Sequence, residues 1–381
     1  MTSNVAETFD QRTSERTLAE FVCWVSEHPE EREALVRLLD ERHPLFFGRS
    51  ANQVARMRCQ ILLAFERTGL PDAAVPFVAE ELQTGMQAYT VAAAARAVRA
   101  LPNPTEDFAP LLLKAIANIA AADDAVSFDY CGRASQLKPT TALQELFTTL
   151  EWMGPAAHSA LPFVNELLTN VKHRFPDSLL PLINAVRNRI SAPASVGRKT
   201  SCCSLRPPPR QSTAESPAGV ILQDQDAVSL RFEEFTQGRP SVVAFFYTRC
   251  DNPQKCSLTI TKLAELQKEL WNRGIQGSIR VAAITYDPEF DLPQRLKAYG
   301  QIRGFKFDED NRIFRVTKGS QIVQDYFQLG VNFVGTVVNR HQIEVYVLNA
   351  AGRIVTSRTR LQWEPADLVD AARPAAANTS A

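Results

Sequence analysis

The spacing of apolar residues changes once along the chain, and this change divides its 381 residues into two parts of different fold class. From about Thr17 to Ile190, apolar residues recur every three or four positions, as on one face of an α-helix. After Gly219, continuous apolar runs such as SVVAFFYT alternate with helical patterns, which is typical of buried strands in an α/β domain. The sequence therefore predicts an all-α domain over 1–190 and an α/β domain over 220–381.

A segment without apolar periodicity, SAPASVGRKTSCCSLRPPPRQSTAESPAG, covers 191–219 between the two predicted domains. Its content of proline, serine and arginine, with three consecutive prolines, predicts a partly extended linker. Cys202 and Cys203 form a vicinal pair within it. Such a pair could deliver metal or thiols to a nearby site, but two idle thiols are the interpretation that we prefer.

The short helices expected in the first domain resemble one another. AAVPFVAEEL (73–82), DFAPLLLKAI (107–116) and SALPFVNELL (159–168) each carry a proline near the start, and Pro76 and Pro110 are 34 residues apart. This step is about the length of one helix–turn–helix repeat of a solenoid, and the pattern resembles HEAT-type repeats. An irregular helical bundle is the alternative. In either case the domain is expected to provide a surface for a protein partner.

Composition argues against several kinds of partner and structure. Lys+Arg and Asp+Glu both total 42, so the net charge gives no indication of nucleic acid binding. No apolar run approaches the roughly 18–20 residues that cross a bilayer, so no transmembrane segment is expected. The start, MTSNVAETFDQRTSER, has no basic region followed by an apolar one, which predicts a cytoplasmic location. Seven scattered cysteines do not form the disulfide framework of a small secreted domain.

Two cysteines, Cys250 and Cys256, lie in the stretch FFYTRCDNPQKCSLT, on a short loop after a predicted buried strand. A redox pair or a soft-metal site needs sulfurs in such a place, whereas two structural cysteines do not. Pro253 favours a turn between them, so both sulfurs can reach one metal ion or form a disulfide. Because Cys256 comes just before a predicted helix, we expect the helix dipole to lower its thiol pKa.

The order of predicted elements in the second domain is that of a thioredoxin-like fold. Two buried strands, 241–248 and 278–287, are each followed by a helix. The segments 342–349 and 353–360 are expected to form a hairpin, and a last helix follows. The cysteine pair lies at the end of the first buried strand.

Three segments of this domain carry a family resemblance: FFYTRC with its second cysteine, AITYDPEFDLPQRLKAY, and VNRHQIEVYVLNAAGRI. Together they make the chain from about Val220 to Ala372 similar to the Sco/SenC family, which are thioredoxin-fold proteins. The resemblance implies copper binding and a metallochaperone role in assembling the copper centres of cytochrome oxidase. It also implies that Cys250 and Cys256 are thiolate ligands and that His341 is the distal imidazole ligand.

Ligand chemistry is compatible with copper, because thiolates suit Cu(I) and imidazole adds the donor that Cu(II) favours. His341 is the only histidine after residue 173, and a surface histidine at a strand edge is its alternative interpretation. The chain departs from the family pattern by having five residues between the cysteines instead of three, and by Phe290 and Leu292 in place of an Arg and a Thr. We therefore interpret Asp287 as a turn residue or a neighbour of a ligand, and not as a ligand.

These observations predict a Sco-like copper-binding protein that uses two cysteines and one histidine and docks a protein client through its helical domain. One alternative is a thiol–disulfide oxidoreductase or peroxidase-like enzyme with Cys250 or Cys256 as nucleophile. Another is a non-catalytic interaction scaffold. Copper stoichiometry separates the first hypothesis from the other two, and disulfide-reductase turnover identifies the second.

Overall fold

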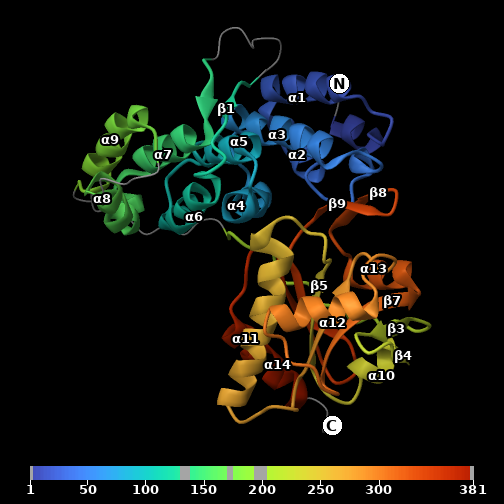
Figure 1. The fold of residues 1–381 in the computed structure, drawn as a ribbon. Helices are drawn as coiled ribbons and strands as arrows, with labels where there is room; N and C mark the ends of the chain where they lie inside the picture. Colours follow the sequence, from blue (N-terminus) through green and yellow to red (C-terminus); the bar gives the residue numbers. More distant parts are fainter. Residues whose placement is uncertain (1–2, 129–137, 170–174, 193–203, 378–381) are drawn as a thin grey trace. The chain divides into compact units, whose positions relative to one another are not determined.

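A computed structural model describes residues 3–128, 138–169, 175–192 and 204–377, and the chain forms two compact units. The described residues of the first unit, Met1–Arg206, are mostly helical, and those of the second, Pro207–Ala381, form helices and a sheet (Figure 1). No helix in the described ranges is long and apolar enough to cross a membrane. The predicted change of fold class along the chain is therefore present in the structure.

The N-terminal unit contains nine α-helices within its described residues. They are α1 (Glu15–Glu27), α2 (Glu33–Arg37), α3 (Ala51–Thr68), α4 (Val75–Thr84), α5 (Ala88–Val98), α6 (Ala109–Ile119), α7 (Ala142–Met153), α8 (Leu161–Thr169) and α9 (Leu180–Ile190). Two short strands, β1 (Ala125–Val126) and β2 (Thr140–Thr141), pair with each other.

The ends of α3 follow from its flanking residues. Ser50 and Gln53 form a capping box at the start, in which each side chain accepts a hydrogen bond from the other's backbone N–H. Gly69 ends the helix with a φ of 80°, a conformation that favours glycine. Both flanking residues are of types that favour helix ends, and the buried face of α1 agrees with its apolar periodicity.

Alternate helices of the N-terminal unit pack on one another: α1 on α3, α3 on α5, α5 on α7, and α7 on α9, while α4 packs on α6. Pro76 and Pro110 lie in the first turns of α4 and α6, where a missing N–H costs no helical hydrogen bond. Stacked helix pairs produce this kind of arrangement. The assignment of these pairs to HEAT-type repeats stays a prediction.

The C-terminal unit is built on a seven-stranded mixed sheet with the order β11-β10-β5-β6-β7-β3-β4. Its strands are β3 (Ile221–Asp224), β4 (Ser229–Arg231), β5 (Ser241–Phe246), β6 (Arg280–Thr285), β7 (Asn311–Lys318), β10 (Glu344–Leu348) and β11 (Ile354–Thr359). The pairs β5–β6 and β6–β7 are parallel, and the other pairs are antiparallel. A separate hairpin consists of β8 (Val331–Val334) and β9 (Val337–His341).

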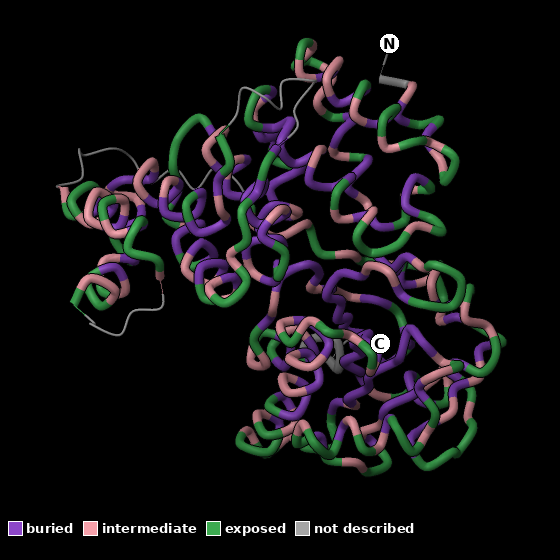
Figure 2. The backbone as a smooth tube through the Cα atoms, turned by 45° about the horizontal axis from the view of Figure 1, so that its top comes forward, coloured by how far each residue is buried: buried purple, intermediate pink, exposed green. Residues whose placement is uncertain are grey.

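Helices cover this sheet and bury its middle strands. They are α10 (Phe232–Thr236), α11 (Leu258–Asn272), α12 (Pro293–Ile302), α13 (Ser320–Phe327) and α14 (Pro365–Ala377). Helices α11 and α14 pack together, α14 also contacts β5 and β10, and α12 contacts β7. Every residue of β5 is buried, as its continuous apolar run predicts, and buried residues occur in both units (Figure 2).

The predicted strands at β5 and β6 and the predicted hairpin of β10 and β11 are present, and together they give the C-terminal unit a thioredoxin-like α/β fold. The sequence did not predict β7, the β3–β4 pair or the β8–β9 hairpin. In β7, the sequence NRIFRVTK mixes charged and apolar residues, and only part of the strand is buried. It therefore lacks the continuous apolar run that identified β5.

Residues 207–219, which the sequence assigned to the linker, belong to the C-terminal unit, and two of them bind β11. The backbone N–H of Arg210 donates to Ser357 Oγ at 2.8 Å, and that of Ser212 donates to the Ile354 carbonyl at 3.0 Å. The unit boundary accordingly falls after Arg206. The part of the predicted linker that contains Cys202 and Cys203 lies outside the described residues.

Candidate metal centre

Three side chains from distant parts of the sequence meet at one end of β5. Cys250 lies on the loop after β5, Cys256 in the turn Pro253–Ser257 that leads into α11, and His341 at the end of β9. Each sulfur lies 3.5 Å from His341 Nε2, and the three donor atoms all lie within 4.8 Å of one another. This group could hold one metal ion.

The loop that carries Cys250 is fixed by a buried carboxylate. Asp291 accepts hydrogen bonds from the Thr248 backbone N–H at 3.0 Å and from Thr285 Oγ1 at 2.5 Å, so it ties the end of β5 to the end of β6. The turn toward Cys256 begins where the Asn252 side chain accepts from the Gln254 N–H at 2.9 Å. The Asp291 contacts fix the start of the loop, and the Asn252 contact stabilises the turn between the cysteines.

His341 is a buried residue, only 5% exposed, so the interpretation as a surface histidine is wrong. Its Nδ1 lies 2.9 Å from the Gln342 carbonyl oxygen, which can only accept. We therefore assign the ring proton to Nδ1, and this leaves the Nε2 lone pair directed at the two sulfurs. The rings of Tyr247 and Tyr286 lie 5.3 and 5.6 Å from the imidazole and restrict its rotation.

A buried polar cluster lies beside the histidine strand. Glu344 accepts hydrogen bonds from Tyr286 Oη at 2.5 Å, the Gly330 N–H at 3.0 Å and Gln342 Nε2 at 3.0 Å. Burial raises the pKa of Tyr286 well above its usual value, so its hydroxyl keeps the proton that it donates. Because Tyr286 also contacts the imidazole, this cluster connects the packing of β10 to the orientation of His341.

The two thiols differ in acidity. A hydrogen bond from Cys256 lowers the pKa of Cys250 well below its ordinary value despite its partial burial. Burial raises the pKa of Cys256, whose side chain is 1% exposed, and the neighbouring Cys250 adds to that effect. The expectation that the helix dipole lowers the pKa of Cys256 is therefore wrong, because desolvation outweighs it.

This asymmetry predicts selective alkylation of the metal-free, reduced protein. At about pH 6, we expect iodoacetamide to modify Cys250 at least about ten times faster than Cys256, because only the thiolate reacts. Trypsin cleaves after Arg249 and Lys255, so the two cysteines fall in separate peptides and mass spectrometry can follow each one. Equal rates in the folded protein would contradict the pKa order, and equal rates after denaturation provide the control.

Asp287 lies outside the three-donor group. It is 3% exposed and accepts a hydrogen bond from Arg249 Nε at 2.9 Å. The guanidinium of Arg249 lies 4.0 Å from the centre of the Phe290 ring, and that of Arg295 also lies 4.0 Å from it. Phe290, one of the departures from the family pattern, thus packs between two arginines beside the site.

Lys255 is a neighbour of the site that the sequence reasoning did not single out. Its Nζ donates to the His341 backbone carbonyl at 2.8 Å. Its position directly before Cys256 was the signal available in the sequence, but a lysine in a polar loop is normally exposed.

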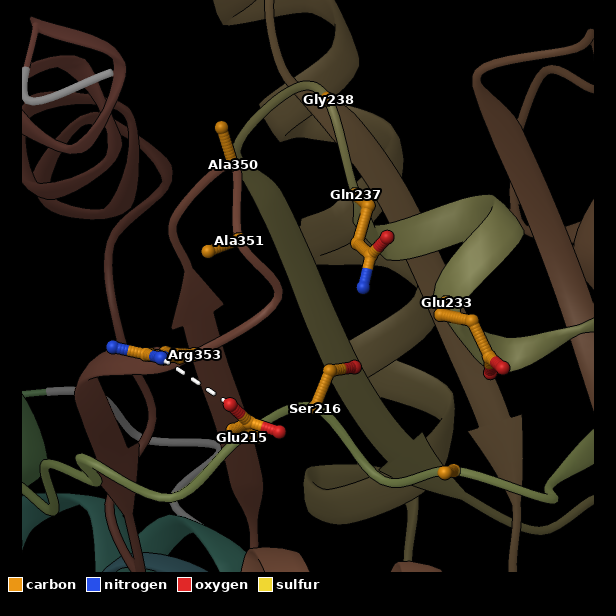
Figure 3. A pocket seen from close by; sticks show the side chains of 9 residues that line it. Glu215, Ser216, Glu233, Gln237, Gly238, Ala350, Ala351 and Arg353 are labelled. Atoms are coloured by element: carbon orange, nitrogen blue, oxygen red, sulfur yellow. Dashed lines mark ion pairs between the residues drawn. The ribbon is translucent and has the colours of Figure 1, made fainter.

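A hollow of about 610 Å³ lies near the start of β5 and the β10–β11 turn (Figure 3). It is lined by Glu215, Ser216, Ala218, Glu233, Gln237, Gly238, Ala350, Ala351 and Arg353. Glu215 and Arg353 are 4.0 Å apart across it, and both side chains are exposed. Its lining contains neither cysteine nor histidine, so the Cys–Cys–His group is the stronger candidate site.

Two sulfurs and one imidazole that meet at the end of a buried strand of a thioredoxin-like domain form a donor set that could hold a metal ion. Residues 221–375 match the SCO1/SenC family, and the C-terminal unit is a domain of that family. Among curated proteins, none matches the chain.

Several solved structures are similar to the chain. A SCO1/SenC family lipoprotein from Bacillus anthracis is 22% identical, with a TM-score of 0.36, and the similarity covers 44% of this chain and 98% of that one. Bradyrhizobium japonicum ScoI, solved with copper bound, is 18% identical, with a TM-score of 0.33 and coverage of 42% and 98%. Yeast Sco1 is 24% identical, with a TM-score of 0.28 and coverage of 37% and 83%.

Proposed function

We propose that the C-terminal unit binds copper through Cys250, Cys256 and His341. The observation that carries this proposal is the approach of both sulfurs to one imidazole nitrogen, at 3.5 Å each. Thiolates favour soft Cu(I), and the imidazole adds a donor that suits Cu(II). The match of this unit to the SCO1/SenC family supports copper over other soft metals.

The three donor residues have different parts in the proposed binding of copper. Cys250 is partly exposed and has the lowered pKa, so it offers an available thiolate at the surface. Cys256 and His341 are buried, and they complete the donor set behind it. Because a metal ligand must be a thiolate, copper binding displaces the proton of Cys256.

Titration of the reduced protein tests this proposal. We expect one Cu(I) per chain, bound tightly in competition with a Cu(I)-specific chelator under anaerobic conditions, with proton release that accompanies binding. A parallel titration with Zn²⁺ measures selectivity, since two cysteines and one histidine also suit zinc. Failure to compete for Cu(I), or a strong preference for zinc, would overturn the proposal.

Thiol–disulfide exchange is the second candidate function, and the unequal acidity of the two cysteines favours it. In this reaction the Cys250 thiolate attacks a disulfide substrate and releases one thiol. Cys256, as its thiolate, then attacks the mixed disulfide, which releases the second thiol and leaves a Cys250–Cys256 disulfide. Reductase turnover with a disulfide substrate and an external thiol reductant distinguishes this function from copper binding.

The helical unit is proposed as the docking surface for a protein client that receives copper. Stacked helix pairs present an extended surface that contacts partners without chemistry of its own, and the described residues of this unit contain no group of cysteine, histidine and carboxylate side chains arranged to hold a metal. We therefore assign the proposed copper binding and thiol exchange to the C-terminal unit.

A further inference from the structure

Lys255 places a positive charge at the donor group. Its ammonium donates to the backbone carbonyl of His341 at 2.8 Å, and the residue itself directly precedes Cys256. Its backbone has φ −109° and ψ −105°, which interrupts the helical path of the turn Pro253–Ser257. The five-residue segment between the cysteines thus folds so that its lysine points toward the histidine strand.

The charge of the site depends on the metal's oxidation state. Two thiolates and a neutral imidazole carry a charge of −2, so bound Cu(I) leaves −1 and bound Cu(II) leaves 0. Adding the ammonium of Lys255 gives 0 with Cu(I) and +1 with Cu(II). Because Cys256 and His341 are buried, an uncompensated charge is costly there, and the neutral combination is favoured.

We propose that Lys255 is a specificity-determining residue that biases this site toward Cu(I) over Cu(II). The inference rests on the proposed copper binding and extends it to the choice between oxidation states. The nearby Arg249 and Asp287 form an ion pair, and Glu344 lies 3.7 Å from Arg210, so both carboxylates have a cationic partner. The effect of Lys255 is independent of these pairs, because replacing it removes one positive charge whatever its other contacts are.

Charge and geometry predict opposite results when Lys255 is replaced. If the ammonium acts by its charge, Lys255→Met relieves a repulsion that is stronger for Cu(II), so the ratio of Cu(I) to Cu(II) affinity falls. If the lysine only positions His341, its loss misplaces the imidazole, and Cu(II) suffers more because two thiolates alone can hold Cu(I). The ratio then rises. The metal-free state is common to both titrations, so its contribution cancels in the ratio.

The experiment measures both affinities by anaerobic competition titration in the full chain and in Lys255→Met, Lys255→Arg and Lys268→Met. Ag(I) and Cd(II) repeat the comparison as redox-inert monovalent and divalent ions. We expect the ratio of monovalent to divalent metal affinity to fall by about 10- to 100-fold in Lys255→Met. Removal of one charge beside a partly buried site has an effect of this size. Lys255→Arg, which keeps the charge, should retain the ratio within about threefold.

Lys268 provides the matched control, since it is an exposed lysine on α11, roughly 18 Å along the helix from Cys256. An unchanged or increased ratio in folded Lys255→Met, with circular dichroism as the folding measurement, would overturn the inference. If the wild-type chain itself binds neither Cu(I) nor Ag(I), the proposed copper function fails instead. The two failures are therefore distinguishable.

Discussion

Replacing either Cys250 or Cys256 by Ser is expected to abolish tight binding of both Cu(I) and Cu(II). Each sulfur is one of only three donors in the group, and a protonated serine hydroxyl is a hard, neutral and poor substitute for a thiolate. Changes outside a ligand set reduce metal affinity about 10- to 100-fold. Loss of a ligand should exceed this range, so we expect at least about a 1000-fold decrease in competition titrations.

Cys59→Ser provides a matched control for these variants. Cys59 is a free, buried thiol on α3, and its sulfur donates to the Tyr89 carbonyl at 3.4 Å, far in sequence from the donor group. Its replacement should leave copper affinity unchanged, although burying a hydroxyl costs about 1–3 kcal/mol of stability. Copper affinity within tenfold of wild type in folded Cys250→Ser or Cys256→Ser would contradict the proposed ligand set.

Local patterns in the sequence predicted the strand and helix on either side of the two cysteines, but not the hairpin that carries His341. The continuous run SVVAFFYT identified β5 because a strand that is covered on both faces needs apolar residues at every position. The spacing of apolar residues indicated the helices, and residues that favour helix ends flank α3. The β8–β9 hairpin was missed, because its strands are short and its exposed residues include Val334 and Val337.

The meeting of His341 with the cysteines could not be derived from such patterns. It depends on the pairing of β9 with β8 and on the adjacency of β10 and β5, which connect residues about 90 positions apart. The resemblance to the Sco/SenC family indicated that His341 lies with the two cysteines, whereas the spacing of apolar residues does not. The acidity of Cys256 was predicted wrongly for a related reason: its position at a helix start is visible in the sequence, whereas its burial is a property of the whole fold.

Polar contacts between residues far apart in the sequence could not be predicted from local patterns either. Arg210 lies in a segment that its composition assigns to the linker, yet its guanidinium donates to the Phe327 carbonyl at 2.9 Å and to Tyr346 Oη at 3.0 Å. It also lies 3.7 Å from the buried carboxylate of Glu344. A segment rich in proline and serine therefore contributes a cation to the polar cluster beside the histidine strand.

Replacing His341 by Ala is expected to weaken Cu(II) binding much more than Cu(I) binding. We expect a decrease of at least about 100-fold for Cu(II), which loses its nitrogen donor, and of less than about tenfold for Cu(I), which two thiolates can hold in near-linear geometry. Since His341 is buried between Tyr247 and Tyr286, truncation also leaves a cavity and should lower the free energy of unfolding by about 1–3 kcal/mol. Chemical denaturation and circular dichroism measure that loss separately.

Two further variants test whether the lower Cu(II) affinity of His341→Ala comes from the missing nitrogen donor. His158→Ala removes an exposed histidine of the helical unit and should change neither affinity. His341→Gln fills more of the cavity but does not restore the nitrogen donor, so it should be more stable than His341→Ala and equally poor at binding Cu(II). The ratio of Cu(I) to Cu(II) affinity should then rise in both His341 variants and fall in Lys255→Met, because one change removes a donor and the other a repelling charge. Unchanged Cu(II) affinity in folded His341→Ala would mean that the imidazole is not a ligand, and that copper at this site is held by sulfur alone.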